Sequence, residues 1–270
     1  MDYAAIAKIY EELDGTTKRL EMTQILVELL KATRNEDVRK VVYLTRGMVA
    51  PDFEGVEFGV ADKLAVKAIY EATRVSGLEE VLLRVGDLGE VAKFAVGKKA
   101  QRALFSEPLT LDRVFGNLVR IARAEGSGAQ ETRAKLLAEL IHDSTPIEAK
   151  YLCRTVVGKL RLGIADMTIV DALSVAFATK EQRGAVERAY NLCSDLGLVA
   201  EKLAAGGIDS LASVSVSAGV PMRAMLCERL PSIPEILTKL GECAFEYKYD
   251  GLRVQAHKSG SVVKLFTRHL

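Results

Sequence analysis

The side chains best suited to covalent chemistry in this sequence surround a single glycine, Gly251. Lys248 and Asp250 precede it, and Arg253 follows it. A lysine amine becomes a nucleophile when it is deprotonated, and burial or a neighbouring cation such as Arg253 lowers its pKa. A neutral Lys248 amine would attack the α-phosphorus of a nucleoside triphosphate and form a phosphoramidate, with Mg²⁺ screening the triphosphate and helping pyrophosphate to leave.

The segment in front of the lysine alternates in side-chain type, which predicts a β-strand over Cys243–Lys248. In a strand, Glu246 and Lys248 lie on the same face, about 6.5–7 Å apart, which leaves room for a ligand. Glu246 would accept a hydrogen bond from an amino group of the base, and Asp250 would orient the lysine or a metal. The competing interpretation is a surface β-turn with Asp250 at its tip. The carboxylate before the lysine and the arginine after it favour the nucleotide site.

The composition admits two domains and disfavours several classes of protein. The 270 residues are 49% hydrophobic with a net charge of +1, and no stretch approaches the roughly 18 apolar residues of a membrane span. Met1-Asp2 leads directly into an amphipathic pattern, so we expect no signal peptide. The four cysteines are far apart and form no C-x-x-C pair. We therefore expect a cytoplasmic protein with free thiols and no metal site within this chain.

Helical periodicity dominates the first 213 residues. Apolar residues recur at the spacing of one helix face, beginning with Ile6, Ile9, Tyr10 and Leu13. Helix starts are predicted at Asn35, at Thr110 and at the capping box Thr145-Pro146-Ile147-Glu148.

The character of the sequence changes after the Gly206-Gly207 pair, in the serine-rich run 210–217. Beyond it, Ser232 is predicted to cap a short helix. Residues 258–261 are typical of a hairpin turn between strands 253–257 and 262–267. We therefore predict an all-α domain over residues 1–215 and the opening of an α+β domain over residues 216–270.

The α domain contains a degenerate repeat. Phe58–Ile69 aligns with Leu162–Leu173 and shares its Gly, Ala, Asp, Val and Ala, and upstream Tyr43–Arg46 matches Tyr151–Arg154. Each copy predicts a helix, a glycine turn and the start of another helix.

The glycine turns of the repeat, at Gly59 and Gly163, are candidate phosphate sites. A turn of this kind leaves free backbone N–H groups at a helix N-terminus, which suits an anion such as phosphate. Two copies related by a pseudo-two-fold axis would match the symmetry of duplex DNA. The competing interpretation is a duplication whose turns only join packed helices.

The second copy is the more basic. The cations that lead into Gly163 are Lys150, Arg154, Lys159 and Arg161. Residues 98–163 together hold twelve Lys/Arg and seven Asp/Glu, which indicates a basic face or, alternatively, an ordinary solvated helix surface.

Gly126 and Ser127 form a further candidate phosphate turn before another predicted helix. This turn is not a P-loop, because no Gly-Lys-Ser/Thr follows at the required spacing. The aromatic content of 6% disfavours base stacking on single strands. We therefore expect contacts to the backbone of a duplex.

Four motifs resemble those of one enzyme family. Glu246–Arg253 resembles the nucleotidyl-lysine motif of ATP-dependent DNA ligases, and Phe266-Thr267-Arg268 resembles their next motif, with Thr where Ser is usual. Pro221–Leu226 resembles the family's entry into the adenylation domain. Lys150–Leu173 is similar to the helical DNA-binding domain of archaeal and eukaryotic replicative ligases. The resemblance runs from near residue 1 to residue 270 and is strongest with the archaeal type.

The resemblance implies a mainly α fold: an all-helical DNA-binding domain with an internal pseudo-repeat, followed by the first strands of an α+β nucleotidyltransferase domain. Lys248 would carry AMP from ATP, Glu246 would bind the adenine amino group, Arg253 the ribose and Arg268 the nucleotide phosphate. The helical domain would hold nicked duplex DNA through minor-groove phosphates on both sides of the break.

The implied reaction is the sealing of nicks in duplex DNA during replication, repair and recombination, with ATP and Mg²⁺ as cofactors. Gln101, Leu104 and Phe105 resemble a short sliding-clamp-binding motif, although the two apolar residues also suit a core. The family's later adenylation motifs and its OB-fold domain lie outside this sequence. We therefore expect this chain alone to bind DNA without sealing nicks. The alternatives are an RNA ligase or capping-type nucleotidyltransferase, and a non-enzymatic helical DNA-binding or scaffold protein.

Overall fold

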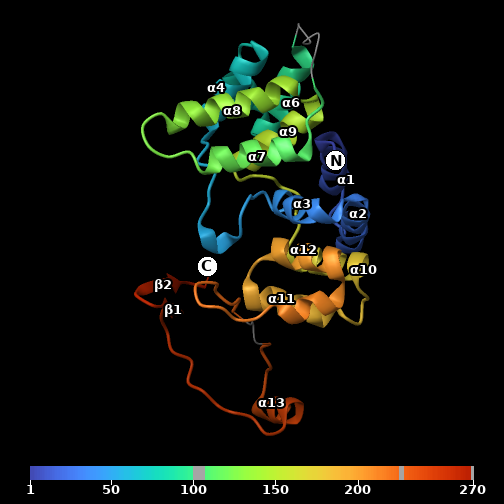
Figure 1. Ribbon diagram of the computed structural model, residues 1–270, viewed down its shortest axis with the longest axis vertical. Coiled ribbons are helices and arrows are strands. Elements are labelled where there is room, and N and C mark those ends of the chain that lie inside the picture. Colours follow the sequence, from blue (N-terminus) through green and yellow to red (C-terminus); the bar gives the residue numbers. More distant parts are fainter. Residues whose placement is uncertain (100–106, 225–227, 269–270) are drawn as a thin grey trace.

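The described part of the chain is mainly helical, which confirms the predicted fold class. The computed structural model describes residues 1–99, 107–224 and 228–268. Figure 1 shows an upper and a lower group of helices, with a two-stranded hairpin beside the lower group and a short helix below it. None of the described helices has both the length and the apolar character needed to span a bilayer.

The upper group contains α4 (Asp62–Thr73), α5 (Leu78–Val85), α6 (Leu88–Lys98), α7 (Leu111–Ala122), α8 (Ala129–Asp143) and α9 (Pro146–Val156). The lower group contains α2 (Arg19–Ala32), α3 (Val38–Thr45), α10 (Asp166–Phe177), α11 (Arg183–Cys193) and α12 (Leu196–Gly206). Short 3₁₀ helices lie at Asn35–Asp37, Asp52–Glu54 and Ile208–Ser213. The C-terminal elements are α13 (Ile233–Leu240), β1 (Gln255–Ser259) and β2 (Val262–Phe266).

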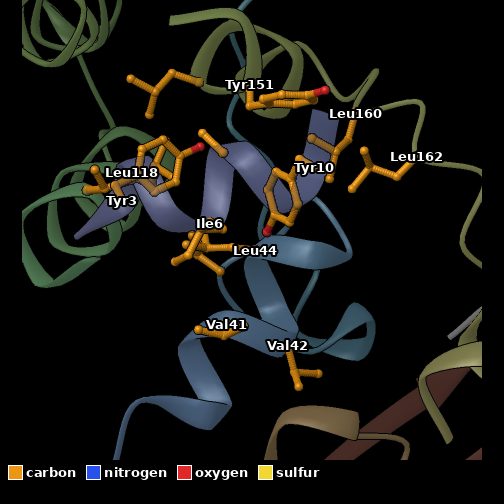
Figure 2. Packing of buried hydrophobic residues seen from close by; sticks show 14 of the residues in the cluster. Tyr3, Ile6, Tyr10, Val41, Val42, Leu44, Leu118, Tyr151, Leu160 and Leu162 are labelled. Atoms are coloured by element: carbon orange, nitrogen blue, oxygen red, sulfur yellow. The ribbon is translucent and has the colours of Figure 1, made fainter. Parts of the chain in front are cut away.

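Helix α1 (Tyr3–Asp14) joins the two groups, because it packs on α9 of the upper group and on α2 of the lower one. Tyr3, Ile6 and Tyr10 of this helix are completely or almost completely buried. Figure 2 shows Tyr10 between Tyr151 of α9 and Leu44 of α3, and its ring meets that of Tyr151 edge-on with centroids 5.4 Å apart. Burying a large apolar side chain contributes about 1.5–3 kcal/mol, so α1 is a major source of cohesion between the groups.

Most predicted helix starts are confirmed by side-chain caps. The Thr110 hydroxyl accepts a hydrogen bond from the backbone N–H of Arg113, 3.2 Å away. The capping box at Thr145 and Glu148 is complete in both directions. The prediction for Asn35 was wrong: it lies inside a 3₁₀ helix, and no side chain caps α3, which simply continues that turn.

The repeat places equivalent helices in opposite groups. The first connection (residues 46–61) runs from α3 in the lower group to α4 in the upper group, and the second connection (residues 157–165) runs from α9 in the upper group to α10 in the lower group. Both α4 and α10 have 12 residues and begin three residues after the repeat glycine. The two copies are therefore intertwined, since each contributes one helix to each group.

A third block of the repeat, which the sequence reasoning missed, holds the intertwined helices together. The motif Asp-Leu-Gly opens α6 at residues 87–89 and α12 at residues 195–197. Asp87 caps α6 and accepts hydrogen bonds from Arg154 of α9, the helix packed on α6. Asp195 caps α12 in the same way and accepts a hydrogen bond from Tyr43 of α3, the helix packed on α12. Each glycine lies where a Cβ would meet that neighbouring helix at under 3 Å, so the absent side chain permits close packing.

Residues 216–268 contain the predicted hairpin but not the strand predicted over Cys243–Lys248. β1 and β2 form the predicted antiparallel hairpin, with Ser259 paired to Val262 beside the turn. The predicted strand over Cys243–Lys248 was wrong: these residues form no strand and pair with neither described strand. A strand forms only where neighbouring backbone accepts and donates its hydrogen bonds, and alternation in the sequence cannot supply that neighbour.

The C-terminal region contacts the helices at two places. The Ser194 hydroxyl donates a hydrogen bond to the Pro221 carbonyl, 2.6 Å away, and the Arg223 guanidinium lies over the Tyr190 ring, 4.6 Å from its centre. Farther along, Phe266 of β2 is buried and meets Phe53 of the first connection edge-on.

Candidate nucleic-acid interface and nucleotide site

The two predicted phosphate turns have the same local structure. We call residues 57–61 the first turn and residues 161–165 the second turn. Gly59 and Gly163 have positive φ angles of 60° and 66°, and both glycines are exposed while the apolar residue before each is buried. The helices that follow, α4 and α10, have no side-chain cap. Their first backbone N–H groups are therefore free to bind an anion.

A cleft of about 610 Å³ lies between the two connections. It is lined mostly by first-connection residues between Gly47 and Ala61, together with Val156 at the end of α9 and Val157 and Gly158 of the second connection. Several lining residues are glycines, so backbone is exposed in the cleft. A concave, backbone-rich surface beside uncapped helix ends can accept a phosphate backbone.

The second turn carries its own positive charge. Lys159 and Arg161 are about half exposed, with side-chain exposures of 54% and 52%. Lys159 lies 3.7 Å from Asp62, and Arg161 donates a hydrogen bond to Asp87 over 3.1 Å. Arg161 also has a left-handed backbone with φ of 58°, which is uncommon for a residue with a side chain.

Two of the cations predicted for this basic surface are not available to DNA. Lys150 and Arg154 are buried, with 4% and 7% exposure. Lys150 contacts the carboxylates of Glu11, Asp14 and Glu90 from α1 and α6. Helix periodicity turns residues 150 and 154 inward, so the sequence excess of cations overstated the charge of the surface.

The buried network fixes the protonation of its members. Burial alone would lower the pKa of Lys150, but its hydrogen bonds to Glu11, Asp14 and Glu90 raise that pKa above its ordinary value. Burial alone would raise the pKa of Asp87, but the hydrogen bonds from Arg154 lower it. Arg154 joins Asp87 to Asp14, so the network ties α1, α6, α9 and the second connection together.

The connection between α7 and α8 holds the third candidate turn. Gly126 and Ser127 are exposed, and Gly126 and Gly128 have positive φ angles of 78° and 94°. No side chain caps α8. Arg133 lies five residues into α8, and its side chain donates hydrogen bonds to the Ala124 carbonyl in this connection and to the Gly59 carbonyl.

The candidate nucleotide residues lie together along one segment but not in a closed pocket. Glu246, Lys248, Asp250 and Arg253 are exposed, as is Gly251. The apolar side chains between them are exposed as well, including Phe245 at 72%, Tyr247 at 88%, Tyr249 at 86% and Leu252 at 75%. Arg268, also exposed, follows β2.

The described residues therefore assemble the DNA candidates more completely than the nucleotide candidates. Gly59, Lys159, Arg161 and Gly163 lie on the two connections, whereas the predicted clamp-binding residues Gln101, Leu104 and Phe105 lie outside the described residues. Within residues 1–99, 107–224 and 228–268, no three His, Cys, Asp or Glu side chains gather as a metal site.

Two residues with a structural role near the turns escaped the sequence reasoning. The role of Asp87 was detectable, because its Asp-Leu-Gly motif recurs at residues 195–197. The two copies of this motif are separated by the same number of residues as Tyr43–Arg46 and Tyr151–Arg154. Arg133 carried no signal of this kind, since its contact with Gly59 spans 74 residues of sequence.

Comparisons with known proteins agree with this architecture. Residues 2–174 match the family model described as DNA ligase N terminus, and residues 224–270 match the model described as ATP dependent DNA ligase domain. The chain is 48% identical to DNA ligase 2 of Thermofilum pendens and 45% identical to DNA ligase 2 of Korarchaeum cryptofilum. It is 44% identical to a probable DNA ligase of Aquifex aeolicus.

Each of these alignments covers 100% of this chain and 46–47% of the relative, so the chain spans about half the length of the curated relatives it matches. The first family model covers well over half of the chain and falls on the intertwined helices. The second covers the lysine-bearing segment. The chain therefore belongs to the ATP-dependent DNA ligases and corresponds to their N-terminal portion.

Proposed function

We propose that the protein seals nicks in duplex DNA in three steps. The Lys248 amine attacks the α-phosphorus of ATP, a P–N bond forms and pyrophosphate leaves. The AMP then passes from the lysine to the 5′-phosphate at the nick. Finally the 3′-hydroxyl attacks that 5′-phosphate, a phosphodiester bond forms and AMP leaves. Family membership and the nucleotidyl-lysine motif support this assignment.

In this proposal each residue of the lysine-bearing segment has one role. Glu246 accepts a hydrogen bond from the adenine amino group, Arg253 binds the ribose and Arg268 binds the nucleotide phosphate. Asp250 orients the Lys248 amine, and Gly251 supports the segment beside it. The family's use of ATP implies a divalent ion such as Mg²⁺, but the described residues form no metal site, so we assign no residue to it.

The helical part, residues 1–215 in this proposal, holds the nicked duplex. One observation carries this: an uncapped glycine turn occurs in each copy of an intertwined repeat, and the first turn lines a cleft that the start of the second connection also lines. Duplex DNA has the same pseudo-two-fold symmetry, so one turn would bind phosphates on each side of the break. Gly126 and Ser127 would add backbone contacts, and Lys159 and Arg161 would add charge.

The remaining parts of the proposal concern the setting of the reaction. Residues 216–270 begin the adenylation domain, and residues 1–270 alone bind DNA without sealing nicks. Gln101, Leu104 and Phe105 bind a sliding clamp. The protein works at the nucleoid in replication, repair and recombination.

Labelled nucleotide tests the catalytic proposal. The full-length protein is incubated with labelled ATP or GTP and Mg²⁺, beside Lys248→Ala and the control Lys258→Ala, which changes another exposed lysine. We expect label from ATP on the wild type and on the control, and none on Lys248→Ala. Label from GTP would indicate a capping-type enzyme, and label on Lys248→Ala would show that another residue is the nucleophile.

Titration of this chain tests the DNA proposal separately. We expect residues 1–270 to bind nicked duplex more tightly than single-stranded RNA, with affinity falling as salt rises. Equal affinity for both nucleic acids would contradict the duplex assignment.

A further inference from the structure

Arg133 connects two of the proposed phosphate turns. Its guanidinium donates hydrogen bonds to the carbonyls of Ile121 at the end of α7, Ala124 in the α7–α8 connection and Gly59 in the first turn, over 3.2, 2.9 and 3.4 Å. One side chain thus fixes the first turn against the connection that carries Gly126. The contact with Gly59 is close, because a Cβ at that glycine would lie 2.9 Å from the guanidinium.

The two copies of the repeat differ in charge at one equivalent position. Glu57 in the first turn aligns with Arg161 in the second, and both side chains are exposed. Asp52 of the first connection is paired with Arg46 over 2.7 Å, and Glu54 adds a further carboxylate, whereas Lys159 and Arg161 are the only charged residues of the second connection. The first turn therefore lacks, in its own sequence, the cation that a phosphate needs nearby.

Arg133 supplies a cation at that place. Its three hydrogen-bond partners are neutral backbone carbonyls, so these contacts do not cancel its charge. A guanidinium has five N–H donors, and three are used here, which leaves donors for a phosphate oxygen. Its rigid fork also matches three fixed acceptors in a way that the single ammonium of a lysine does not.

We propose that Arg133 is a positioning residue that locks the first turn and the α7–α8 connection into one phosphate-binding surface and gives that surface its charge. The proposal rests on the function proposed above and deepens it. The second turn carries its own cation, Arg161, whereas the first borrows one from α8. The two halves of the interface would thus bind the duplex by different means despite the similar local structure of their turns.

Charge and geometry can be separated by two substitutions in the 270-residue chain. Arg133→Lys keeps the charge but cannot hold three carbonyls, so we expect affinity for nicked duplex to fall about tenfold with the salt dependence unchanged. Arg133→Gln loses both, so we expect at least the same loss of affinity and a log–log salt slope smaller by about 0.9. Binding is measured by anisotropy at several salt concentrations.

Arg113→Gln is the matched control. Arg113 lies in the first turn of α7, the helix whose last turn contains Ile121. It is partly buried and pairs with Asp143 over 2.6 Å, and among the described residues it makes no hydrogen bond or ion pair with residues 57–61 or with the α7–α8 connection. It should lower the melting temperature without changing affinity. If the Arg133 variants do not fold, Gly59→Ala replaces them: its Cβ would meet the guanidinium at 2.9 Å and would strain the positive-φ turn, so unchanged affinity in this variant would overturn the positioning role.

The outcomes distinguish this inference from the proposed function. If the folded wild type does not bind nicked duplex, the DNA-binding proposal fails and this inference fails with it. If the wild type binds and Arg133→Lys or the Gly59→Ala substitute binds equally well, only the positioning role of Arg133 is overturned. Loss of affinity in Arg133→Lys, with Arg113→Gln unaffected, supports it.

Discussion

Two lysines in different regions of the molecule show what a folded environment does to an amine. Lys150 is buried in the helical region among three carboxylates, and Lys248 is exposed on an extended segment. The carboxylates raise the pKa of Lys150, so it stays charged and serves to join helices. Lys248 lies in the segment that resembles a nucleotidyl-lysine motif, and its side chain is exposed. A sequence motif indicates which side chain is the candidate nucleophile, but the groups around that side chain determine whether it can react.

The two regions differ in packing in the same way. In the helical region, every large aromatic side chain of α1 is buried. In the lysine-bearing segment, Phe245, Tyr247 and Tyr249 are all exposed. Buried contacts surround the connections that carry the DNA candidates, whereas residues 244–253 of the lysine-bearing segment are exposed. The helical region should therefore account for nearly all of the measured stability, and three pairs of substitutions test this.

The largest difference is expected between two tyrosines. Tyr10→Ala removes a fully buried ring that packs on Tyr151 and whose hydroxyl lies 3.3 Å from that of Thr45. We expect the free energy of unfolding to fall by about 3–5 kcal/mol. Tyr249→Ala removes a ring that is 86% exposed and should leave stability unchanged. Urea denaturation followed by circular dichroism measures both variants. A comparable fall in the free energy of unfolding of Tyr249→Ala would contradict the expectation that the helical region provides most of the stability.

A smaller difference is expected from the buried network, and it depends on pH. Asp87→Asn replaces a carboxylate that accepts hydrogen bonds from Arg154 with a neutral amide, so we expect the free energy of unfolding to fall by about 2 kcal/mol at neutral pH. Because the pKa of Asp87 is lowered in the folded state, its contribution is present above its unfolded pKa of about 4 and is lost as the pH falls through the lower folded value.

Melting temperatures measured from about pH 7 down to pH 3 check this assignment. The wild type should lose stability steeply below about pH 4, and Asp87→Asn should lose less over the same range because it lacks one titrating group. Asp250→Asn, in the exposed segment, is the control and should follow the wild-type profile. Identical acid profiles for wild type and Asp87→Asn would show that this carboxylate does not carry the acid sensitivity.

Local signals in the sequence predicted what local forces decide. The caps at Thr110 and Thr145, the hairpin after Arg253 and the glycine turns are each determined within a few residues, and the structure confirms them. The role of Lys150 was missed because it depends on carboxylates up to 139 residues away. The strand at Cys243 failed for the same reason, since strands depend on distant partners.

For the candidate site as well, the sequence predicted the local features but not the contacts between distant residues. Residue types and spacing identified Gly59, Gly163 and Lys248 as candidates. They did not reveal that the first connection, which is acidic, lies against Arg133 of α8, because that pairing exists only after the helices have packed. Functional motifs are thus easier to find in a sequence than the residues that position them.

The smallest expected effect compares two helix caps of the same kind. Thr145→Ala removes the hydroxyl that caps α9, a helix with nine buried residues, and should cost about 1 kcal/mol of global stability. Ser232→Ala removes the equivalent cap of α13, which has no buried residue. We expect it to speed amide exchange within α13 while leaving the urea midpoint unchanged, because α13 can unfold without breaking any buried contact. If Ser232→Ala lowered the midpoint as much as Thr145→Ala, the C-terminal segment would belong to the same cooperative unit as the helices.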